Sequence, residues 1–164
     1  MRATDEVLEV GYGPGAALER VLELAPCGRV SGVDFSETMF RQARRRHAAA
    51  IASGRVSLHL GDLGSLPAGQ AFDRVFAVNV LYFVPDPQEF AKSLHARLKP
   101  RGRVALFIRP EADLCRMRFP AAGSFRFFAP AEVEALLREA GCSRAWSEAR
   151  SVGGGTGHCV LAER

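Results

Sequence analysis

The stretch that most constrains the fold runs from Asp5 to Gly15 and reads DEVLEVGYGPG. Its apolar residues favour an extended conformation and are bounded sharply by glycine, so residues 6–10 are predicted to form a buried strand. From Pro14 onward, apolar residues recur at helical spacing, and a helix entrance accepts both proline and glycine because its first amides have no partner within the helix. The sequence therefore predicts a strand, a glycine turn and a helix in direct succession.

This turn has the features of a ligand-binding loop. Glycines allow a positive φ and let the backbone come close to a ligand, while the helix start offers N–H groups to an anion. We therefore expect a ligand with an anionic end and a flat ring system. Gly11, Gly13 and Ala16 also satisfy the dinucleotide fingerprint, in which alanine can replace the third glycine, so a nicotinamide or flavin site stays open here. A plain tight turn is a further alternative.

Length and composition indicate one domain covering residues 1–164. The chain is 48 % hydrophobic, which is enough for one real core in 164 residues, but the length is too short for two ordinary domains. The first residues contain acids and no long apolar run, so we expect no membrane segment and a cytoplasmic protein. The four cysteines are scattered singly without metal-ligand spacing, so we expect reduced thiols and no metal site.

The net charge of +4 is partly local, since one predicted helix carries four arginines, at positions 41, 44, 45 and 46. Arginines around a helix are usually a solvated face, and no interleaved aromatic residues or reading motif accompany them. Nucleic acid is therefore not the expected partner, although a basic surface can attract RNA.

Further along the chain, apolar runs alternate with helical patterns. Strands are predicted at 29–33, 56–60, 72–78 and 103–108, and helices at 37–51 and 88–98. This alternation is typical of a mostly parallel sheet covered on both faces. After a helix that opens at Pro130, two strand-like runs at 143–149 and 158–162 are joined by residues 151–157, which suits an antiparallel hairpin closing the sheet edge.

Two acids follow predicted strands of this sheet. Asp34 lies at the end of the second strand, about 20 residues after the glycine turn, where an acid can bind a ribose; capping of the next helix, by Asp34 or Ser36, is the alternative. Asp62 follows the third strand, where its carboxylate can accept a hydrogen bond from an exocyclic amine such as that of adenine; a simple turn residue is the alternative.

Together these motifs resemble those of the class I S-adenosylmethionine-dependent methyltransferases. VLEVGYGPG is similar to the first motif of that family, GVDFSETMFRQAR to the stretch after its second strand, and GDLGSLP to its adenine-side motif. FDRVFAVNVLYFVPDP resembles the fourth-strand motif, and LKPRGRVAL the turn into the fifth strand, with Arg101 where the family usually has glycine. The resemblance covers nearly the whole chain. It implies a Rossmann-like α/β fold with a seven-stranded, mostly parallel sheet, an antiparallel C-terminal strand and helices on both faces.

The resemblance also implies a cofactor, S-adenosyl-L-methionine, with S-adenosyl-L-homocysteine as the product. The glycine loop and Glu9 would hold the methionyl part, with Asn79 near its end. Asp34 would bind the ribose hydroxyls, and Asp62 the adenine amine. The full set of implied cofactor-binding residues is Glu9, Gly11, Tyr12, Gly13, Gly15, Asp34, Phe35, Met39, Asp62, Leu63 and Asn79. Pro14 removes an amide that a pyrophosphate would use, which favours this cofactor over a dinucleotide.

No catalytic residue is identified, because a sulfonium donor is already activated and needs only an in-line nucleophile and exclusion of water. Tyr82 and His158 are substrate-side candidates, although Tyr82 can equally pack against Phe83. A small-molecule acceptor is favoured by elimination, since nothing reads like NPPY or DPPY. An RNA or protein methyltransferase, or a cofactor-binding domain that has lost activity, are the alternatives.

Family members usually carry an N-terminal helical segment that covers the cofactor, whereas here the first strand begins almost at Met1. We therefore expect this lid helix to be missing. Either the chain is shortened, or cover comes from residues 110–129 or from a second subunit in a homodimer. The phenylalanines of that segment, at positions 119, 125, 127 and 128, can instead pack under the helix that opens at Pro130.

Overall fold

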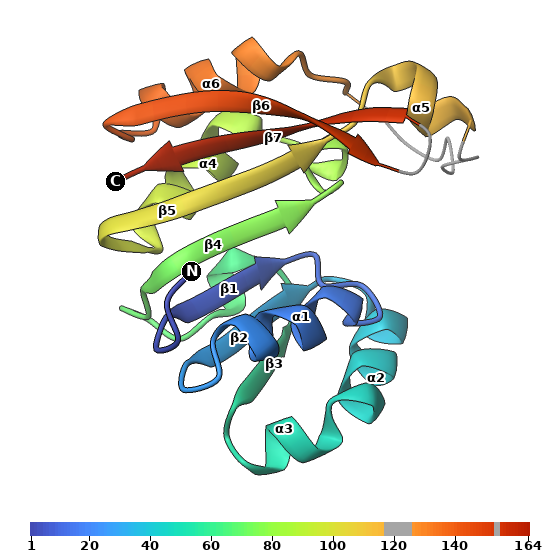
Figure 1. Cartoon of the computed structure of the whole chain (residues 1–164), viewed down its shortest axis with the longest axis vertical. Helices are drawn as coiled ribbons and strands as arrows, with labels where there is room; N and C mark the ends of the chain where they lie inside the picture. The colour runs from blue at the N-terminus through green and yellow to red at the C-terminus, as the bar shows by residue number, and fades with distance from the viewer. Residues whose placement is uncertain (117–125, 153–154) are drawn as a thin grey trace.

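The computed structural model describes residues 1–116, 126–152 and 155–164 and contains a seven-stranded sheet (Figure 1). Its strands lie in the order β3-β2-β1-β4-β5-β7-β6. The first five are parallel, and β7 runs antiparallel to both β5 and β6. Their bounds are Glu6–Val10 (β1), Arg29–Asp34 (β2), Val56–Leu60 (β3), Phe72–Val78 (β4), Leu98–Ile108 (β5), Arg144–Val152 (β6) and Gly155–Glu163 (β7). The predicted fold class is confirmed.

Helices connect these strands and cover the sheet. They are α1 (Ala16–Leu24), α2 (Glu37–Arg46), α3 (Ala48–Ala52), α4 (Pro87–Ala96), α5 (Glu111–Arg116) and α6 (Pro130–Glu139), with short 3₁₀ turns η1 (Leu63–Ser65) and η2 (Leu81–Phe83). None of the helices in the described ranges is both long and apolar enough to cross a bilayer.

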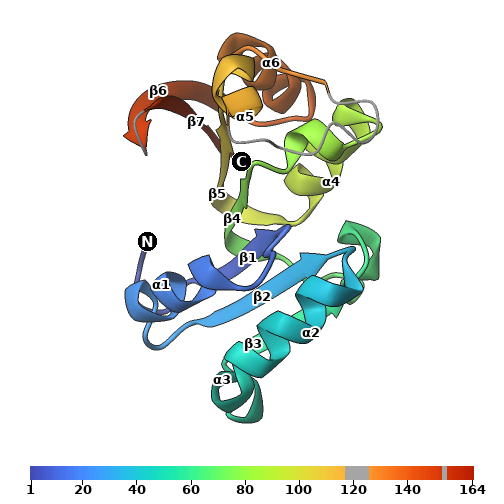
Figure 2. The ribbon, with the colours of Figure 1, turned by 90° about the vertical axis from the view of Figure 1, so that its right-hand side faces the viewer.

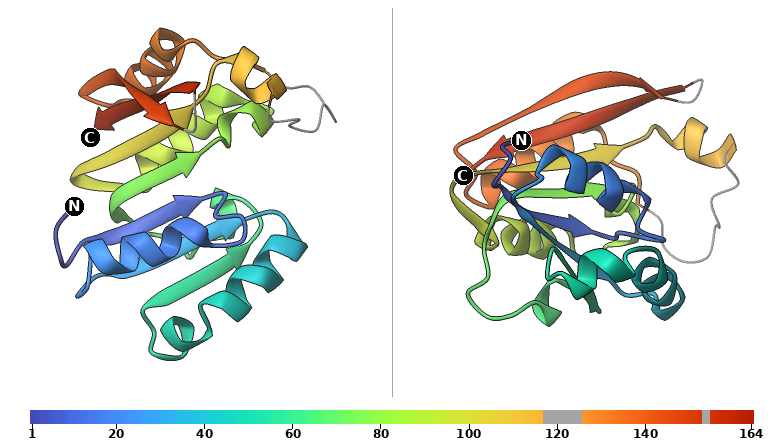
Figure 3. Two further views of the ribbon diagram at one scale, coloured as in Figure 1. Left: turned by 45° about the vertical axis from the view of Figure 1, so that its right-hand side comes forward. Right: turned by 60° about the horizontal axis from the view of Figure 1, so that its bottom comes forward.

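Strand alternation divides the core into two clusters on opposite faces of the sheet. Val7 and Val30 pack with Leu18 of α1 and Ala43 of α2. Leu8 instead belongs to a larger cluster that includes buried residues of α4 and α6. Figures 2 and 3 show α1 near β1 and β2, and α4 and α6 near β4, β5 and β7. Helices thus lie on both faces, as predicted.

On the α1 side, the half of the sheet formed by β4, β5 and β7 is less covered. Phe76, Ala105 and Leu161 form one row across these strands and are only partly buried. In the next row, Val78 is 44 % exposed. This partly exposed surface adjoins β1, the strand that leads into the glycine loop. The missing lid helix stays a prediction.

Three element boundaries differ from the sequence prediction. The helix expected at 37–51 is two helices, because the chain breaks at His47, which is 4 % exposed and lies 2.7 Å through Nε2 from the Gly15 carbonyl oxygen. Strand β5 begins at Leu98, five residues before the predicted start, and includes the expected turn, where Arg101 adopts a φ of 65°. Strand β6 extends to Val152 and β7 begins at Gly155. Most residues of the joint predicted at 151–157 are therefore paired in the hairpin.

The segment proposed as a cover contains a helix that the sequence pattern did not indicate, α5. Phe128 is 7 % exposed and packs in the cluster of Val133 and Leu137, which confirms packing under α6 for this residue. Phe127 is 36 % exposed. Phe119 and Phe125 lie outside the described residues.

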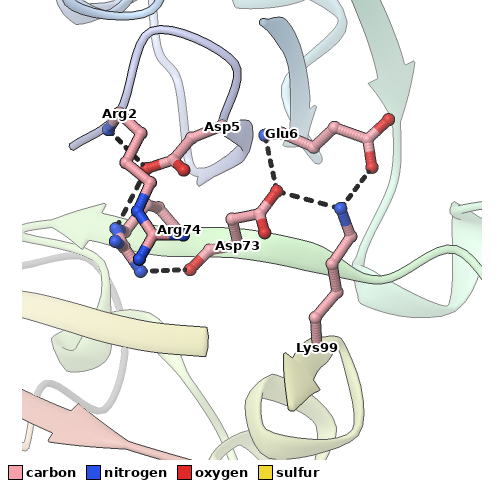
Figure 4. Close-up of polar contacts among 6 residues, drawn as sticks. All are labelled: Arg2, Asp5, Glu6, Asp73, Arg74 and Lys99. Carbon is pink, nitrogen blue, oxygen red and sulfur yellow. Dashed lines mark hydrogen bonds and ion pairs between the residues drawn. The ribbon is translucent and has the colours of Figure 1, made fainter. Parts of the chain in front are cut away.

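A polar network fixes the amino ends of β1 and β4, away from the glycine loop (Figure 4). The Arg74 guanidinium lies 3.2 Å from the buried Asp5 carboxylate. Lys99 Nζ lies 2.8 Å from Glu6 Oε2 and 2.9 Å from Asp73 Oδ2. Asp73 also accepts the backbone N–H of Glu6 at 2.8 Å. The charged end of the sheet is therefore internally paired, whereas the opposite end is free to form a site.

Candidate functional site

The carboxyl ends of the parallel strands meet at a cavity of about 380 Å³. It receives residues from the ends of β1, β2 and β3 and from the segment leading into α4. The lining residues are Val10, Gly11, Val33, Asp34, Phe35, Gly61, Asp62, Leu63, Gly64, Phe83, Val84, Pro85, Asp86, Glu89, Phe90 and Ser93. Open parallel sheets place ligands in this crevice, so the cavity is the candidate functional site.

The glycine loop after β1 needs its glycines for backbone conformation. Gly11, Gly13 and Gly15 have φ of 70°, 54° and 80°. A Cβ on Gly11 would lie 2.4 Å from Cγ2 of Val80, so the close approach of the segment after β4 also requires glycine there. All three glycine amides bond within the protein, to Val33 O, the Asp34 carboxylate and Tyr12 O. The glycine amides are therefore not available to an anion, and the expected donors are those of the helix start. Free donors remain in the first turn of α1, which no side chain caps.

Asp34 joins the glycine loop to the start of α2. Its side chain accepts the backbone N–H of Gly13 and of Ser36, each at 2.8 Å, and the residue is 8 % exposed. The capping role belongs to Ser36, whose Oγ accepts the Met39 N–H at 3.4 Å. Because a carboxylate has about four acceptor positions, Asp34 keeps capacity for hydroxyl donors of a ligand.

Asp62 makes the turn contact considered for it and also faces the cavity. It lines the cavity, and its Oδ1 accepts the Gly64 N–H at 2.8 Å at the start of η1. The next residue, Leu63, is buried and lines the same cavity, while Phe35 from the β2 side is 76 % exposed at its rim. Carboxylate, aliphatic and aromatic groups thus meet at the position where the sequence analysis predicts an adenine.

Glu9 is the least compensated charged group near the site. It is 3 % exposed, and its Oε2 has no hydrogen-bond partner. Burial, and next the negative charge of Asp34, raise the pKa of Glu9 to about 8. Glu9 does not line the cavity itself but precedes Val10 and Gly11, which do.

Asn79 resembles Glu9 in having an unused acceptor. Its Oδ1 is buried without a partner, and its backbone adopts a φ of 57°, which asparagine tolerates better than most residues. The Asn79 N–H donates to the Phe107 carbonyl at 3.0 Å. Since Val10 pairs with Ala77, Glu9 and Asn79 lie near the same end of adjacent strands.

The remaining predicted residues do not line the cavity. Tyr12 is 3 % exposed and its hydroxyl donates to the His59 carbonyl at 3.2 Å, and Met39 is half-buried at the start of α2. Tyr82, expected on the substrate side, is 1 % exposed; its hydroxyl contacts the backbone N–H and carbonyl of Arg109. His158 is half-buried in β7 between Ile108 and Ala149. The structure thus corrects the placement of Tyr82, whose hydroxyl is committed to the core.

Sequence reasoning missed the wall that α4 contributes. Phe83, Val84 and Phe90 supply apolar surface there, and Asp86 accepts the Glu89 N–H at 3.0 Å as the cap of α4. The helix itself was expected, at 88–98, and Asp86 followed by Pro87 is a helix-start pattern, but this pattern does not indicate which face of the helix lines a cavity.

The charges of the lining select the kind of ligand. Four carboxylates, those of Asp34, Asp62, Asp86 and Glu89, line the cavity, and the lining residues of the described chain include no lysine or arginine. This occurs in a chain of net charge +4. An acidic cavity with apolar walls favours a cationic ligand with an aromatic part and disfavours a pyrophosphate.

Comparisons with known proteins agree with this chemistry. Residues 7–102 match the family model of a methyltransferase domain. The uncharacterized methyltransferase YdaC of Bacillus subtilis is 33 % identical over 111 residues, which cover 66 % of this chain and 59 % of that protein. The 27-O-demethylrifamycin SV methyltransferase of Amycolatopsis mediterranei is 32 % identical over 152 residues, covering 86 % of this chain and 55 % of the relative.

A solved structure shows the same fold. The apo form of the S-adenosylmethionine-dependent methyltransferase SibL matches with a TM-score of 0.77 at 23 % identity, over 98 % of this chain and 50 % of that one. The chain spans less than two thirds of the length of the two curated relatives. The family model nevertheless covers more than half of the chain. The chain therefore belongs to the methyltransferase domain family.

Proposed function

We propose that this domain binds S-adenosyl-L-methionine in the acidic cavity and transfers its methyl group to a small-molecule nucleophile. The observation that carries the proposal is the meeting of Asp34, Asp62 and the glycine loop at one apolar-walled cavity without a basic lining residue. The bound donor would supply a sulfonium, from which a methyl group can be displaced without a covalent enzyme intermediate.

The residues present fit such a donor at three points. Asp34 has spare acceptor positions for ribose hydroxyls, and Asp62 for an adenine amine. Leu63 and Phe35 offer apolar surface beside Asp62. Glu9 and Asn79 each have an unpartnered oxygen, and these are acceptors that an ammonium group can satisfy.

In the chemical step the protein would act by positioning the reactants and by excluding water. Apolar groups of Phe83, Val84 and Phe90 would exclude water from the cavity, which strengthens every electrostatic contact inside it. A neutral amine can attack without a base, whereas an oxygen nucleophile would need one. The Tyr82 hydroxyl accepts the backbone N–H of Arg109, so we do not propose Tyr82 as that base.

A small-molecule acceptor is supported by one relative, which is named for methylation of 27-O-demethylrifamycin SV. The cavity points the same way, because its four carboxylates would repel a nucleic-acid backbone. The arginine-rich helix α2 lies outside the cavity lining, so the polyanion alternative has no support from the site.

The proposal is tested by binding and by transfer. Calorimetry should show binding of S-adenosylmethionine and S-adenosylhomocysteine but not of NADH, and Asp34→Ala should abolish that binding. Incubation with a methyl-labelled donor and a cell extract should label the small-molecule fraction rather than RNA or protein. Binding of NADH in place of the sulfonium compound would contradict the proposal, and tight binding without any labelled product would support a domain that has lost activity.

A further inference from the structure

We infer that Glu9 carries a proton in the ligand-free protein and releases it when a ligand bearing an ammonium group binds, so that the site exchanges a proton for the cation of its ligand. This inference rests on the proposed function, because the ammonium would be that of the methionyl part of the cofactor. It assigns to Glu9 a role in selecting the charge of the ligand.

The first support is the burial of Glu9 without compensation. The residue is 3 % exposed, and Oε2 has no hydrogen-bond partner. An isolated ionised carboxylate removed from water is very costly, so such a group takes up a proton instead. Among the described residues, no recorded ion pair involves Glu9.

The neighbouring elements supply no positive charge that acts on Glu9. On the flanking strands its register partners are Gly32 and Phe76, which carry no charge. Buried titratable groups of the neighbouring elements include Asp34 at the end of β2, Tyr12 in the glycine loop and His47 between α2 and α3, whereas the charged residues of α1 are exposed and those of β4 lie at its amino end.

Of these groups, Asp34 acts against ionisation of Glu9. Burial first and the Asp34 charge second raise the Glu9 pKa to about 8, and Asp34 also contributes to raising the pKa of Tyr12, after burial. His47 is engaged through Nε2 with the Gly15 carbonyl. With such a pKa, roughly nine tenths of the Glu9 side chains would be protonated at pH 7.

The second support is that another unused acceptor lies beyond the end of the next strand. Asn79 Oδ1 is also buried and unpartnered, and Asn79 directly follows β4, which pairs with β1. Two unused oxygens suit a group with several N–H donors and no acceptor, which describes an ammonium. Once Glu9 is ionised, neither oxygen suits an anionic group.

The direction of the pH dependence follows from linkage. The ammonium stabilises the ionised form of Glu9, so binding lowers the Glu9 pKa and releases the proton to the solvent. Affinity should therefore rise with pH by up to about tenfold per unit below pH 8 and level off above that value.

The test is calorimetric titration with S-adenosylhomocysteine, which carries the ammonium, in phosphate and in Tris buffer at pH 7. The dependence of the measured heat on the ionisation enthalpy of the buffer should report release of nearly one proton, and the affinity should rise between pH 6 and pH 8. Adenosine, which lacks the amino acid part, should bind without proton release.

Two variants separate Glu9 from the rest of the site. Glu9→Gln should bind S-adenosylhomocysteine with no proton release and with a flat pH profile, while the matched control Asp62→Asn should bind more weakly but keep the proton release. Should Glu9→Gln fail to fold, infrared spectroscopy of the unaltered protein should show the band of a buried carboxylic acid that disappears when the ligand binds.

The possible failures are distinguishable. If S-adenosylhomocysteine binds the unaltered protein with heats independent of the buffer and with a constant affinity from pH 6 to pH 8, the inference about Glu9 is wrong while the proposed function stands. If S-adenosylhomocysteine does not bind at any pH, the proposed function itself fails.

Discussion

The backbone N–H of Gly13 donates to the Asp34 carboxylate at 2.8 Å, which joins the loop after β1 to the end of β2. Asp34 also accepts the Ser36 N–H at 2.8 Å, so its orientation is set from two sides. A side chain held in this way loses little conformational freedom when a ligand binds, which favours affinity. The loop and the acid therefore act as one unit of the site.

Replacement of Asp34 by asparagine tests this unit. The asparagine oxygen can accept one of the two backbone N–H groups, but the amide nitrogen cannot accept the other N–H or a hydrogen bond from a ribose hydroxyl. Because hydrogen bonds to charged groups contribute about 1.5–3 kcal/mol each, the affinity for S-adenosylhomocysteine should fall roughly 10- to 100-fold. Glu37→Gln, at the exposed start of α2, is the control and should leave the calorimetric affinity unchanged. Equal affinities of the two variants for S-adenosylhomocysteine would show that Asp34 does not contact the ligand.

The glycines of the loop are not equivalent, and alanine substitutions should show it. Both Gly11→Ala and Gly13→Ala place alanine in a left-handed conformation, which costs about 1–2 kcal/mol. Gly11→Ala also drives a Cβ to 2.4 Å from Val80 Cγ2, whereas nothing lies within 4 Å at Gly13. Urea unfolding should therefore show a further loss of about 1–3 kcal/mol for Gly11→Ala.

Shortening Val80 should partly rescue the Gly11 variant, because the clash is with a side-chain methyl group. The double variant Gly11→Ala/Val80→Ala should lose less stability than the sum of the two single losses. Simple additivity, or equal losses for Gly11→Ala and Gly13→Ala, would show that the approach of Val80 does not constrain the loop.

Tyr82→Phe distinguishes a core residue from a substrate contact. The hydroxyl bonds to the Arg109 backbone, so its removal leaves a buried N–H without its partner and should cost about 1–3 kcal/mol of unfolding free energy. Binding of S-adenosylhomocysteine should stay within twofold of the original value. Unchanged thermal stability together with weakened methyl transfer would instead restore Tyr82 to the substrate side.

The network at the amino ends of the strands should contribute stability that depends on pH. Partial burial alone would raise the Asp73 pKa, but the Glu6 N–H and the Lys99 ammonium outweigh it and hold the Asp73 pKa below its usual range. A lowered folded-state pKa means that the stabilisation is present above the unfolded pKa, near 4, and is lost as the pH falls through the folded value.

Asp73→Asn should accordingly lower stability by about 0.5–1 kcal/mol at pH 7, a modest effect because the pair is partly solvated. The difference from the original protein should shrink as the pH is lowered below 4, as followed by urea unfolding. Glu23→Gln is the control, because Glu23 pairs with Arg20 on the exposed surface of α1 and takes no part in this network. A difference that is constant between pH 7 and pH 3 would exclude the ionic contribution.

The sheet and much of the site could be predicted from the sequence because both rest on local patterns. Short apolar runs bounded by glycine or acids marked the parallel strands, and Asp34 and Asp62 follow such runs directly. The parallel order then brings the strand ends to one edge, where Gly11, Asp34 and Asp62 line the same cavity.

Features that depend on contacts between distant residues could not be predicted. The break at His47 depends on its contact with the Gly15 carbonyl, 32 residues away in the chain. The Tyr82 hydroxyl accepts the backbone N–H of Arg109, which holds the side chain in the core. The unpartnered oxygens of Glu9 and Asn79 become visible only when every neighbour is placed. Periodicity reports which face a side chain takes, but not whether its polar atoms find partners there.

The most direct test of the central claim is a crystal structure of the protein with bound S-adenosylhomocysteine. We expect the adenosyl group between Asp34 and Asp62, with its ring beside Leu63, and the amino group at the end of β1 within reach of Glu9 and Asn79. Ligand density at another surface, with these acids still paired only to the backbone, would contradict the assignment of the cavity as the cofactor site.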